Sequence, residues 1–471
     1  MAVDLTNKLS ELFSGWAGEQ LSSINALPGS GSYRQYYRLE GIDKKCLGVY
    51  NADKKENLAF LTFTRHFIKI GLPVPDIYAV DSENDIYLIR DLGDTTLYSL
   101  LPGNSGSGFP QGLIELYKKV ITVLVRFQVN GNKALDYSVC YPRAGFDRLS
   151  MMLDLNYFKY YFVKLSAILF DEQQLENDFI SFCDFLLMAD CNYFMYRDFQ
   201  SRNIMIHEGD PYFIDYQGGR KGPLQYDLAS LLYQAKAEVP DEIRNMLILY
   251  YFDVIGSLIP FDRELFMKYF PGYILMRIIQ TLGAYGFRGF IEKKQHFTDS
   301  IPFAIKNLSA IINTVTNVDI PEMKRIFEQA ASIYSVRDKL SVPDNLRVTI
   351  NSFSYRKAIP ADEYGNGGGY VFDCRAVNNP GRHDRYKDLT GRDDEVISFL
   401  MDQSDAGRFL SYIYQVVDYS VEKYQNLGYE NLLVNFGCTG GKHRSVYCAE
   451  KLAAHLKEKY QVQIFLKHNE L

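Results

Sequence analysis

The chain has 471 residues, of which 47% are hydrophobic and 23% charged, and its formal net charge is −6. This length predicts two or three domains, and the composition is that of a soluble globular protein, which excludes fibrous and disordered classes. From Asn345 onward the sequence holds 16 Lys and Arg against 16 Asp and Glu, so charge gives no support for RNA as a partner, although a local basic patch is compatible with one.

The chain begins MAVDLTNKLSELFSGW, in which acidic residues stand among apolar ones, as in an amphipathic helix and unlike an export signal. The longest apolar runs fall far short of the roughly 20 residues that a bilayer span requires. Seven cysteines occur without a C-x-x-C pair, which is typical of reduced thiols and not of a disulfide or zinc framework. We therefore expect a cytoplasmic protein without a membrane partner.

A small α+β lobe is predicted over about residues 1–95. Short β-like runs (YYRLEG, KCLGVYN, DIYLIRDL) alternate with one helical stretch near Leu58 to Ile70. Between the first strands lies the loop PGSGSYR, whose small residues would let backbone N–H groups approach nucleotide phosphates. The candidate nucleotide-binding residues are Gly29, Ser30, Gly31 and Ser32, although glycine turns between strands are common.

A mainly helical lobe is predicted over about residues 96–334. Its apolar spacing is helical from Gly112, is interrupted by two short strands (FMYRDFQ and PYFIDYQ) around a polar loop, and becomes helical again to about Tyr334. The segment 335–346 (SVRDKLSVPDNL) loses apolar content and contains the helix breaker Pro343. We therefore place a linker at 335–346 and a second domain at 347–471.

The polar loop carries three oxygen-bearing side chains at defined spacing. Asp198 and Asn203 lie in YRDFQSRN, and Asp215 follows twelve residues after Asn203. Phosphoryl transfer from ATP uses a carboxylate that accepts a hydroxyl proton, and an Asn and an Asp that hold Mg²⁺ against the nucleotide phosphates. Asp198 is therefore the candidate base, and Asn203 and Asp215 are the candidate metal ligands. The alternative is that Asp198 and Asn203 only cap turns.

A family resemblance covers roughly residues 10 to 330. LPGSGSYRQYYRL, GLPVPDIY, IRDLGDTTL, YRDFQSRNIM, YFIDYQGG and GPLQYDLASLL resemble, in order, the aminoglycoside phosphotransferases and the bacterial kinases of N-acetylmuramate and N-acetylglucosamine. The resemblance implies a bilobal protein-kinase-like fold and an ATP-dependent phosphotransferase that acts on an amino sugar or related cell-wall sugar, at the anomeric hydroxyl. It also implies that Asp154 in LDLNYF meets the acceptor sugar, unless Asp154 is an exposed helical acid, and that Asp227 braces the catalytic loop.

The sequence departs from most kinases in its third strand. The lysine expected there is replaced within CLGVYNADKKEN by Gly48, Val49, Tyr50 and Asn51. In the amino-sugar kinases this position is also commonly not lysine, so the gap favours that branch. Arg34 or Arg38 could supply the charge, or each could simply be solvated on an exposed strand.

The second domain is predicted to be a separate α/β domain with a phosphate-binding loop between a strand and a helix. VTINSFSY and YVFDCRAV precede LLVNFGCTGGKHRSVYCAEKLAAHL, in which Cys438 to Ser445 have C-x5-R-S spacing. A phosphate would be bound by the loop N–H groups, by the start of the helix and by Arg444, which would donate hydrogen bonds to two phosphate oxygens. Cysteine phosphatases use such a loop to activate a thiolate, so phosphatase chemistry at Cys438 is an alternative.

This domain resembles the C-terminal domain of the RapZ-type RNase adaptor proteins across about 347–460, through SFSYRKAIP, YVFDCRAVNNP, LTGRDDEV and GCTGGKHRSV. The resemblance implies a site for an amino-sugar phosphate, with contributions to RNA and partner binding. The implied phosphosugar-binding residues are Cys438, Thr439, Gly440, Gly441, Lys442, His443, Arg444 and Ser445, with Asp373, Arg375, Asn378, Asn379, Pro380, Thr390 and Gly391 closing over the ligand. A regulatory protein that binds nucleotide or phosphosugar, with RNA or protein partners, therefore stands beside the kinase hypothesis.

Overall fold

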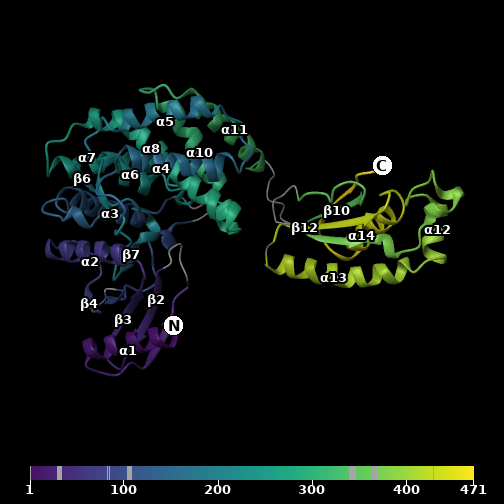
Figure 1. The fold of residues 1–471 in the computed structure, drawn as a ribbon, viewed down its shortest axis with the longest axis horizontal. Helices are drawn as coiled ribbons and strands as arrows, with labels where there is room; N and C mark the ends of the chain where they lie inside the picture. Colours follow the sequence, from purple (N-terminus) through teal and green to yellow (C-terminus); the bar gives the residue numbers. More distant parts are fainter. Residues whose placement is uncertain are drawn as a thin grey trace. The chain divides into compact units, whose positions relative to one another are not determined.

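The computed structural model describes residues 2–28, 34–81, 83, 85–102, 109–338, 346–362, 369–427 and 429–471. The chain forms two compact units, Met1–Lys339 and Leu340–Leu471, and each has its own hydrophobic core (Figure 1). Among the helices that the structure describes, none combines the length and the apolar character needed to cross a membrane.

The small lobe is a five-stranded antiparallel sheet with a helix packed on each face. Tyr87 and Ile89 point into the core that contains helix α2 (Lys54–Lys69), whereas Ile86 and Leu88 pack with helix α1 (Ala2–Ala17). Alternate residues of one strand therefore serve the two faces. The strand order is β1 (Ser23–Ala26), β2 (Gln35–Glu40), β3 (Lys45–Tyr50), β5 (Ile86–Ile89) and β4 (Ile77–Val80).

Helix α2 begins four residues before the expected helical stretch because Asp53 caps it. The Asp53 carboxylate accepts the N–H groups of Lys55 and Glu56, which supplies partners for donors that the first helical turn leaves unpaired. The cap brings Glu56 into the first turn of the helix.

The large lobe is helical and carries two short antiparallel ribbons. One ribbon pairs β6 (Tyr193–Met195) with β9 (Arg220–Gly222), and the other pairs β7 (Ile204–His207) with β8 (Asp210–Phe213). The two predicted strands are confirmed as β6 and β8, both shorter than expected. The helices are α3 (Gln111–Val129), α4 (Arg148–Phe158), α5 (Glu172–Leu186), α6 (Leu224–Leu232), α7 (Asp241–Gly256), α8 (Arg263–Gly286), α9 (Gln295–Thr298), α10 (Ile301–Ile311) and α11 (Pro321–Asp338).

Helix α11 corrects the start of the predicted linker. It runs to Asp338, so residues 335–338 are helical. These four residues include neither Pro nor Gly, and Pro343 restricts only itself and the residue before it. The remaining linker residues 339–345 lie outside the described part of the chain.

The second unit contains a four-stranded sheet in which every described pairing is parallel, as expected for an α/β domain. Ser354 lies beside Cys438 in the register, so the carboxyl ends of the two central strands meet where the glycine loop begins. The strand order is β11 (Tyr370–Asp373), β12 (Asn431–Cys438), β10 (Arg347–Ser354) and β13 (Gln463–His468), and the helices are α12 (Asp394–Asp402), α13 (Ala406–Leu427) and α14 (Arg444–Lys459).

Candidate active site and phosphate loop

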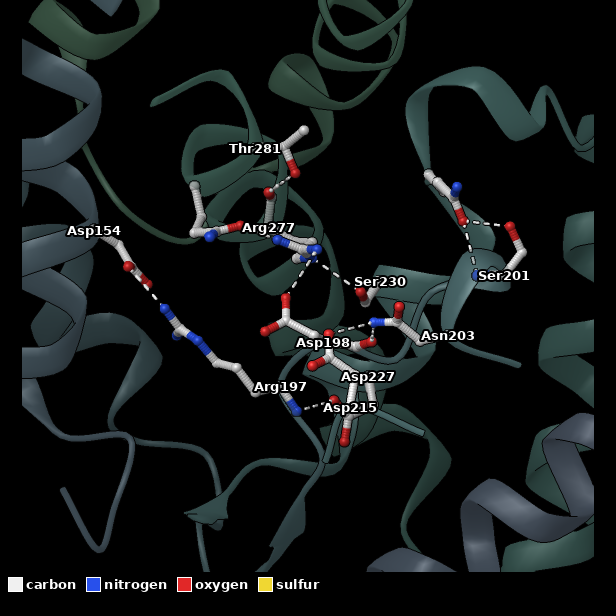
Figure 2. A network of polar contacts seen from close by, with 12 residues as sticks. Asp154, Arg197, Asp198, Ser201, Asn203, Asp215, Asp227, Ser230, Arg277 and Thr281 are labelled. Atoms are coloured by element: carbon white, nitrogen blue, oxygen red, sulfur yellow. Dashed lines mark hydrogen bonds and ion pairs between the residues drawn. The ribbon is translucent and has the colours of Figure 1, made fainter. Parts of the chain in front are cut away.

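Asp198, Asn203 and Asp215 lie close together (Figure 2), in the connections from β6 to β7 and from β8 to β9. The Asn203 amide Nδ2 donates to the carbonyl oxygen of Asp198 at 2.9 Å and to Asp215 Oδ2 at 3.1 Å. Because both N–H donors of the amide are used, Oδ1 is the atom of Asn203 that can ligate a cation.

Asp215 follows strand β8 in a left-handed conformation, with φ +70°. Its Oδ1 accepts a hydrogen bond from Gln217 Nε2 at 2.7 Å. Burial, and then the nearby negative charge of Asp198, raise the pKa of the Asp215 carboxyl. A cation bound at Asp215 would offset both effects.

The donor set fits Mg²⁺. Magnesium prefers oxygen ligands and is commonly held by one or two protein groups together with substrate phosphates. Asn203 and Asp215 supply an amide and a carboxylate oxygen. Within the described ranges no group of three or more His, Cys, Asp or Glu side chains could hold a metal ion, so nucleotide phosphates would have to complete this site.

Asp198 has a cationic neighbour that the sequence analysis missed. Arg277 Nη2 on helix α8 lies 3.7 Å from Asp198 Oδ1, and Arg277 Nε donates to Ser230 Oγ at 2.9 Å. The sequence signal was a charged residue inside the apolar run ILMRII, because a buried arginine requires partners. Arg277 also lines a small pocket with Gln200, Ser230, Tyr233, Gln234, Ala235, Ile278, Thr281, Tyr285 and Ala304.

Asp227 on helix α6 holds the backbone that directly precedes Asp198. Its carboxylate accepts the backbone N–H groups of Tyr196 at 2.7 Å and Arg197 at 2.9 Å. Burial raises the pKa of Asp227 to about 7, and the two N–H donors act against that rise. Arg197 itself has φ +81°, so these bonds hold a backbone conformation that is unfavourable for a residue other than glycine.

Asp154 is neither solvent-exposed nor unpaired. Its Oδ1 lies 2.8 Å from Arg197 Nη2, and both side chains are largely buried. Figure 2 shows Asp154 and Arg197 pointing toward each other. Arg197 directly precedes the candidate base, Asp198. The second carboxylate oxygen of Asp154 is buried and has no hydrogen-bond partner among the described residues. The role of Asp154 toward an acceptor stays a prediction.

The two arginines of the small lobe differ. Arg38 is bound to Asp91 Oδ2 at 2.7 Å and to Asp94 Oδ1 at 2.9 Å. Arg34 is buried and lies 3.2 Å from Glu56 Oε1 on helix α2, so the expectation of a solvated arginine is wrong for it. The predicted nucleotide-binding residues Gly29, Ser30, Gly31 and Ser32 lie outside the described residues.

The Cys438 to Ser445 loop turns around a buried sulfur atom. Cys438 is 3% exposed, and its Sγ accepts the Gly441 N–H at 3.2 Å and lies 3.2 Å from Ser445 Oγ. Gly441 has φ +70°, which favours glycine. Thr439, Gly440 and Lys442 are exposed, so they form the accessible part of the loop.

Arg444 makes backbone contacts that the sequence did not predict. Its Nη1 donates to the carbonyl oxygens of Arg375 at 3.1 Å and Val377 at 3.0 Å, and the residue is buried. Both bonds come from Nη1, and the expected contact of Arg444 with two phosphate oxygens stays a prediction. Carbonyl groups of the segment that follows strand β11 hold the guanidinium. Sequence spacing could not predict this contact, because the two segments are far apart along the chain.

The flanking blocks make different contacts with the loop. The Gly391 N–H donates to the Lys442 carbonyl at 2.8 Å, and His443 Nε2 lies 2.8 Å from the Tyr386 carbonyl. Among the other candidates, Asp373 pairs with Arg375, Asn378 donates to the Gln403 carbonyl, Asn379 accepts the Gly381 N–H, and Thr390 donates to Asp393.

Models of two different protein families match the two units. The model of the phosphotransferase enzyme family matches residues 23–264, and the model of the RapZ C-terminal domain matches residues 346–471. A nucleotide-binding protein of Dictyoglomus thermophilum is 33% identical over 125 residues, which are 26% of this chain and 41% of that protein. A nucleotide-binding protein of Xylella fastidiosa strain M12 is 36% identical over 132 residues, 28% of this chain and 44% of that protein. The chain thus spans less than half the length of these curated relatives.

Solved structures resemble the chain over about two thirds of its length. A choline kinase from Cryptosporidium parvum Iowa II aligns with a TM-score of 0.48 and 12% identity, covering 70% of this chain and 100% of that one. A thermostable mutant of aminoglycoside phosphotransferase APH(4)-Ia aligns with a TM-score of 0.42 and 16% identity, covering 65% and 99%.

Proposed function

The chain belongs to the phosphotransferase enzyme family, and on that premise we propose that its N-terminal unit transfers the γ-phosphoryl group of ATP to an amino sugar or a related cell-wall sugar, at the anomeric hydroxyl. The observation that carries this proposal is the contact of Asn203 with both Asp198 and Asp215. In the proposed reaction, which takes place in the cytoplasm, Asp198 accepts the proton of the acceptor hydroxyl. When bound, Mg²⁺ neutralises charge on the nucleotide phosphates.

The other residues take supporting roles in this proposal. Asn203 and Asp215 hold the metal, and the loop of Gly29, Ser30, Gly31 and Ser32 covers the nucleotide. Arg277 Nη2 lies 3.7 Å from Asp198 Oδ1, and in this proposal it orients the carboxylate of the candidate base. Asp154 is placed to act on the acceptor side or to fix Arg197.

For the C-terminal unit we propose a site for an amino-sugar phosphate at the loop from Cys438 to Ser445. The exposed Lys442 supplies charge, and the exposed Thr439 and Gly440 offer polar groups. Cysteine phosphatase chemistry is not favoured, because Cys438 is buried and its sulfur is bonded within the loop.

The kinase proposal is tested by incubating the protein with Mg-ATP and N-acetylmuramate, N-acetylglucosamine or an aminoglycoside, and measuring ATP consumption. We expect turnover with at least one sugar, and a fall of about 100-fold or more in Asp198→Asn, since a positioned base contributes about 10²–10⁴-fold. Asp210→Asn is the matched control. Asp210 lies in the β7–β8 ribbon, and its exposed carboxylate pairs with Lys119 of helix α3. Absence of turnover with every acceptor, or equal rates for wild type and Asp198→Asn, would contradict the proposal.

A nucleotide- or phosphosugar-binding regulator is a second candidate, favoured by curated relatives that are named nucleotide-binding proteins. Binding of Mg-ATP or of an amino-sugar phosphate without turnover would support it. An RNA partner would show filter binding that weakens steeply as salt rises, because phosphate contacts release counterions.

A further inference from the structure

Gly48, Val49, Tyr50 and Asn51 stand where the third strand of most kinases carries its phosphate-contacting lysine. Val49 of strand β3 is fully buried and lies between Tyr36 of β2 and Tyr87 of β5 in the register. It belongs to the same core as Phe60 of helix α2, so it faces the helix that carries Glu56. Val49 therefore brings no cation to this position of the strand.

Arg34 brings a cation to the same face from a different part of the chain. It immediately precedes strand β2, is 4% exposed, and its guanidinium lies 5.6 Å from the centre of the Phe60 ring. Its Nη2 lies 3.2 Å from Glu56 Oε1. This ion pair is the counterpart of the lysine–glutamate pair that protein kinases form between a strand and a helix.

A continuous set of contacts links the pair to the candidate metal ligand. Gln217 Nε2 donates to Glu56 Oε1 at 3.1 Å and to Asp215 Oδ1 at 2.7 Å. Asn51 Nδ2 fixes the other oxygen of Glu56 at 2.9 Å. A chain of contacts, called the relay below, thus connects the small lobe to the large lobe through Arg34, Glu56, Gln217 and Asp215.

We infer that Arg34 replaces the strand lysine as a positioning residue: it holds Glu56 and, through Gln217, orients Asp215 toward the metal-bound nucleotide. Arg38 does not share this role, since Asp91 and Asp94 bind its guanidinium. The inference rests on the proposed kinase reaction and adds the source of the missing positive charge.

The test measures the dissociation constant for Mg-ATP, and the Mg²⁺ concentration that gives half-maximal nucleotide binding, in purified full-length protein. Arg34→Gln should raise both by about 10- to 100-fold, as loss of a partner that orients a metal ligand does. Arg34→Lys should recover most of the loss. The double variant Arg34→Gln with Val49→Lys should also recover binding, because it returns a cation to the usual strand position.

Arg38→Gln is the matched control and should leave both values unchanged. Gln217→Leu cuts the relay without touching the buried arginine, so it serves if Arg34→Gln does not fold, and it should also raise the Mg²⁺ requirement. Wild-type values in folded Arg34→Gln, or in Gln217→Leu, would overturn the inference. Nucleotide binding without turnover would refute only the kinase reaction, whereas a wild-type protein that does not bind Mg-ATP would overturn both.

Discussion

At the residue scale, groups outside the catalytic motif hold the candidate active site in place. Arg197 and Asp215 adopt φ angles of +81° and +70°, and such backbone conformations cost about 1–3 kcal/mol each and persist only where the surroundings impose them. Asp227 imposes the first through two hydrogen bonds, and Gln217 holds the carboxylate of Asp215. The geometry of the motif therefore depends on these neighbours.

Replacement of Asp227 by alanine should destabilise the N-terminal unit. Two buried N–H groups would lose their acceptor, and each unsatisfied donor costs about 1–3 kcal/mol. We expect the free energy of unfolding, measured in urea, to fall by roughly 2–6 kcal/mol. Asp253→Ala, at a largely exposed carboxylate on helix α7, should change it by less than about 0.5 kcal/mol. Equal effects of the two substitutions would show that Asp227 does not brace the loop.

The raised pKa of Asp215 predicts a pH dependence for metal and nucleotide binding. Without a cation, the raised pKa adds stability at low pH, and this stability is lost as pH rises through the folded-state value. A metal ion requires the ionised carboxylate, so its binding strengthens over the same rise. The increase in melting temperature caused by Mg-ATP should therefore shrink as pH falls through the raised pKa of Asp215, and should be small at all pH values in Asp215→Asn. A shift that does not change with pH would contradict this assignment.

The sequence predicted those parts of the site that lie close together along the chain. Asp198, Asn203 and Asp215 lie close together along the chain, so their spacing together with the family resemblance indicated their association. Arg277 reaches the site from helix α8, and Glu56 reaches Gln217 from helix α2. Such contacts depend on packing between distant elements, which local patterns do not determine.

At the scale of elements, the strand, loop and helix of the C-terminal unit depend on a neighbouring segment for their shape. Sequence order and patterning were sufficient to predict β12, the loop and α14, because parallel strands followed by glycine loops and helices form a common unit. The contact of Gly391 with the loop backbone was not predictable in the same way. It joins segments about fifty positions apart, and only the tertiary fold brings them together.

Gly391→Ala should weaken binding of an amino-sugar phosphate at this loop. A Cβ atom at position 391 would overlap the carbonyl oxygen of His443 and the backbone nitrogen of Tyr447, so the loop would have to move. Overpacking of this kind costs about 1–3 kcal/mol, and we expect a matching loss of stability together with weaker binding by calorimetry. Gly407→Ala, on helix α13 where a Cβ would meet no atom within 4 Å, is the control. Unchanged binding in Gly391→Ala would show that the segment around Gly391 does not shape the ligand site.

At the scale of the whole molecule, the chain joins two units whose cores share no residues. The N-terminal core spans both lobes of the kinase-like unit, and the C-terminal core lies between the parallel sheet and its helices. Separate cores can unfold as separate cooperative units, because the packing that stabilises one does not stabilise the other. A ligand of one unit should then act on the stability of that unit alone.

Calorimetry of the full chain should therefore show two unfolding transitions with different ligand responses. A ligand at 100 times its dissociation constant stabilises the unit that binds it by about 2.7 kcal/mol, so Mg-ATP should raise one melting temperature and an amino-sugar phosphate the other. Asp215→Asn should abolish only the first response and Lys442→Gln should weaken only the second, since each substitution alters one site. A single transition, or movement of both transitions by either ligand, would instead indicate that binding in one unit changes the stability of the other.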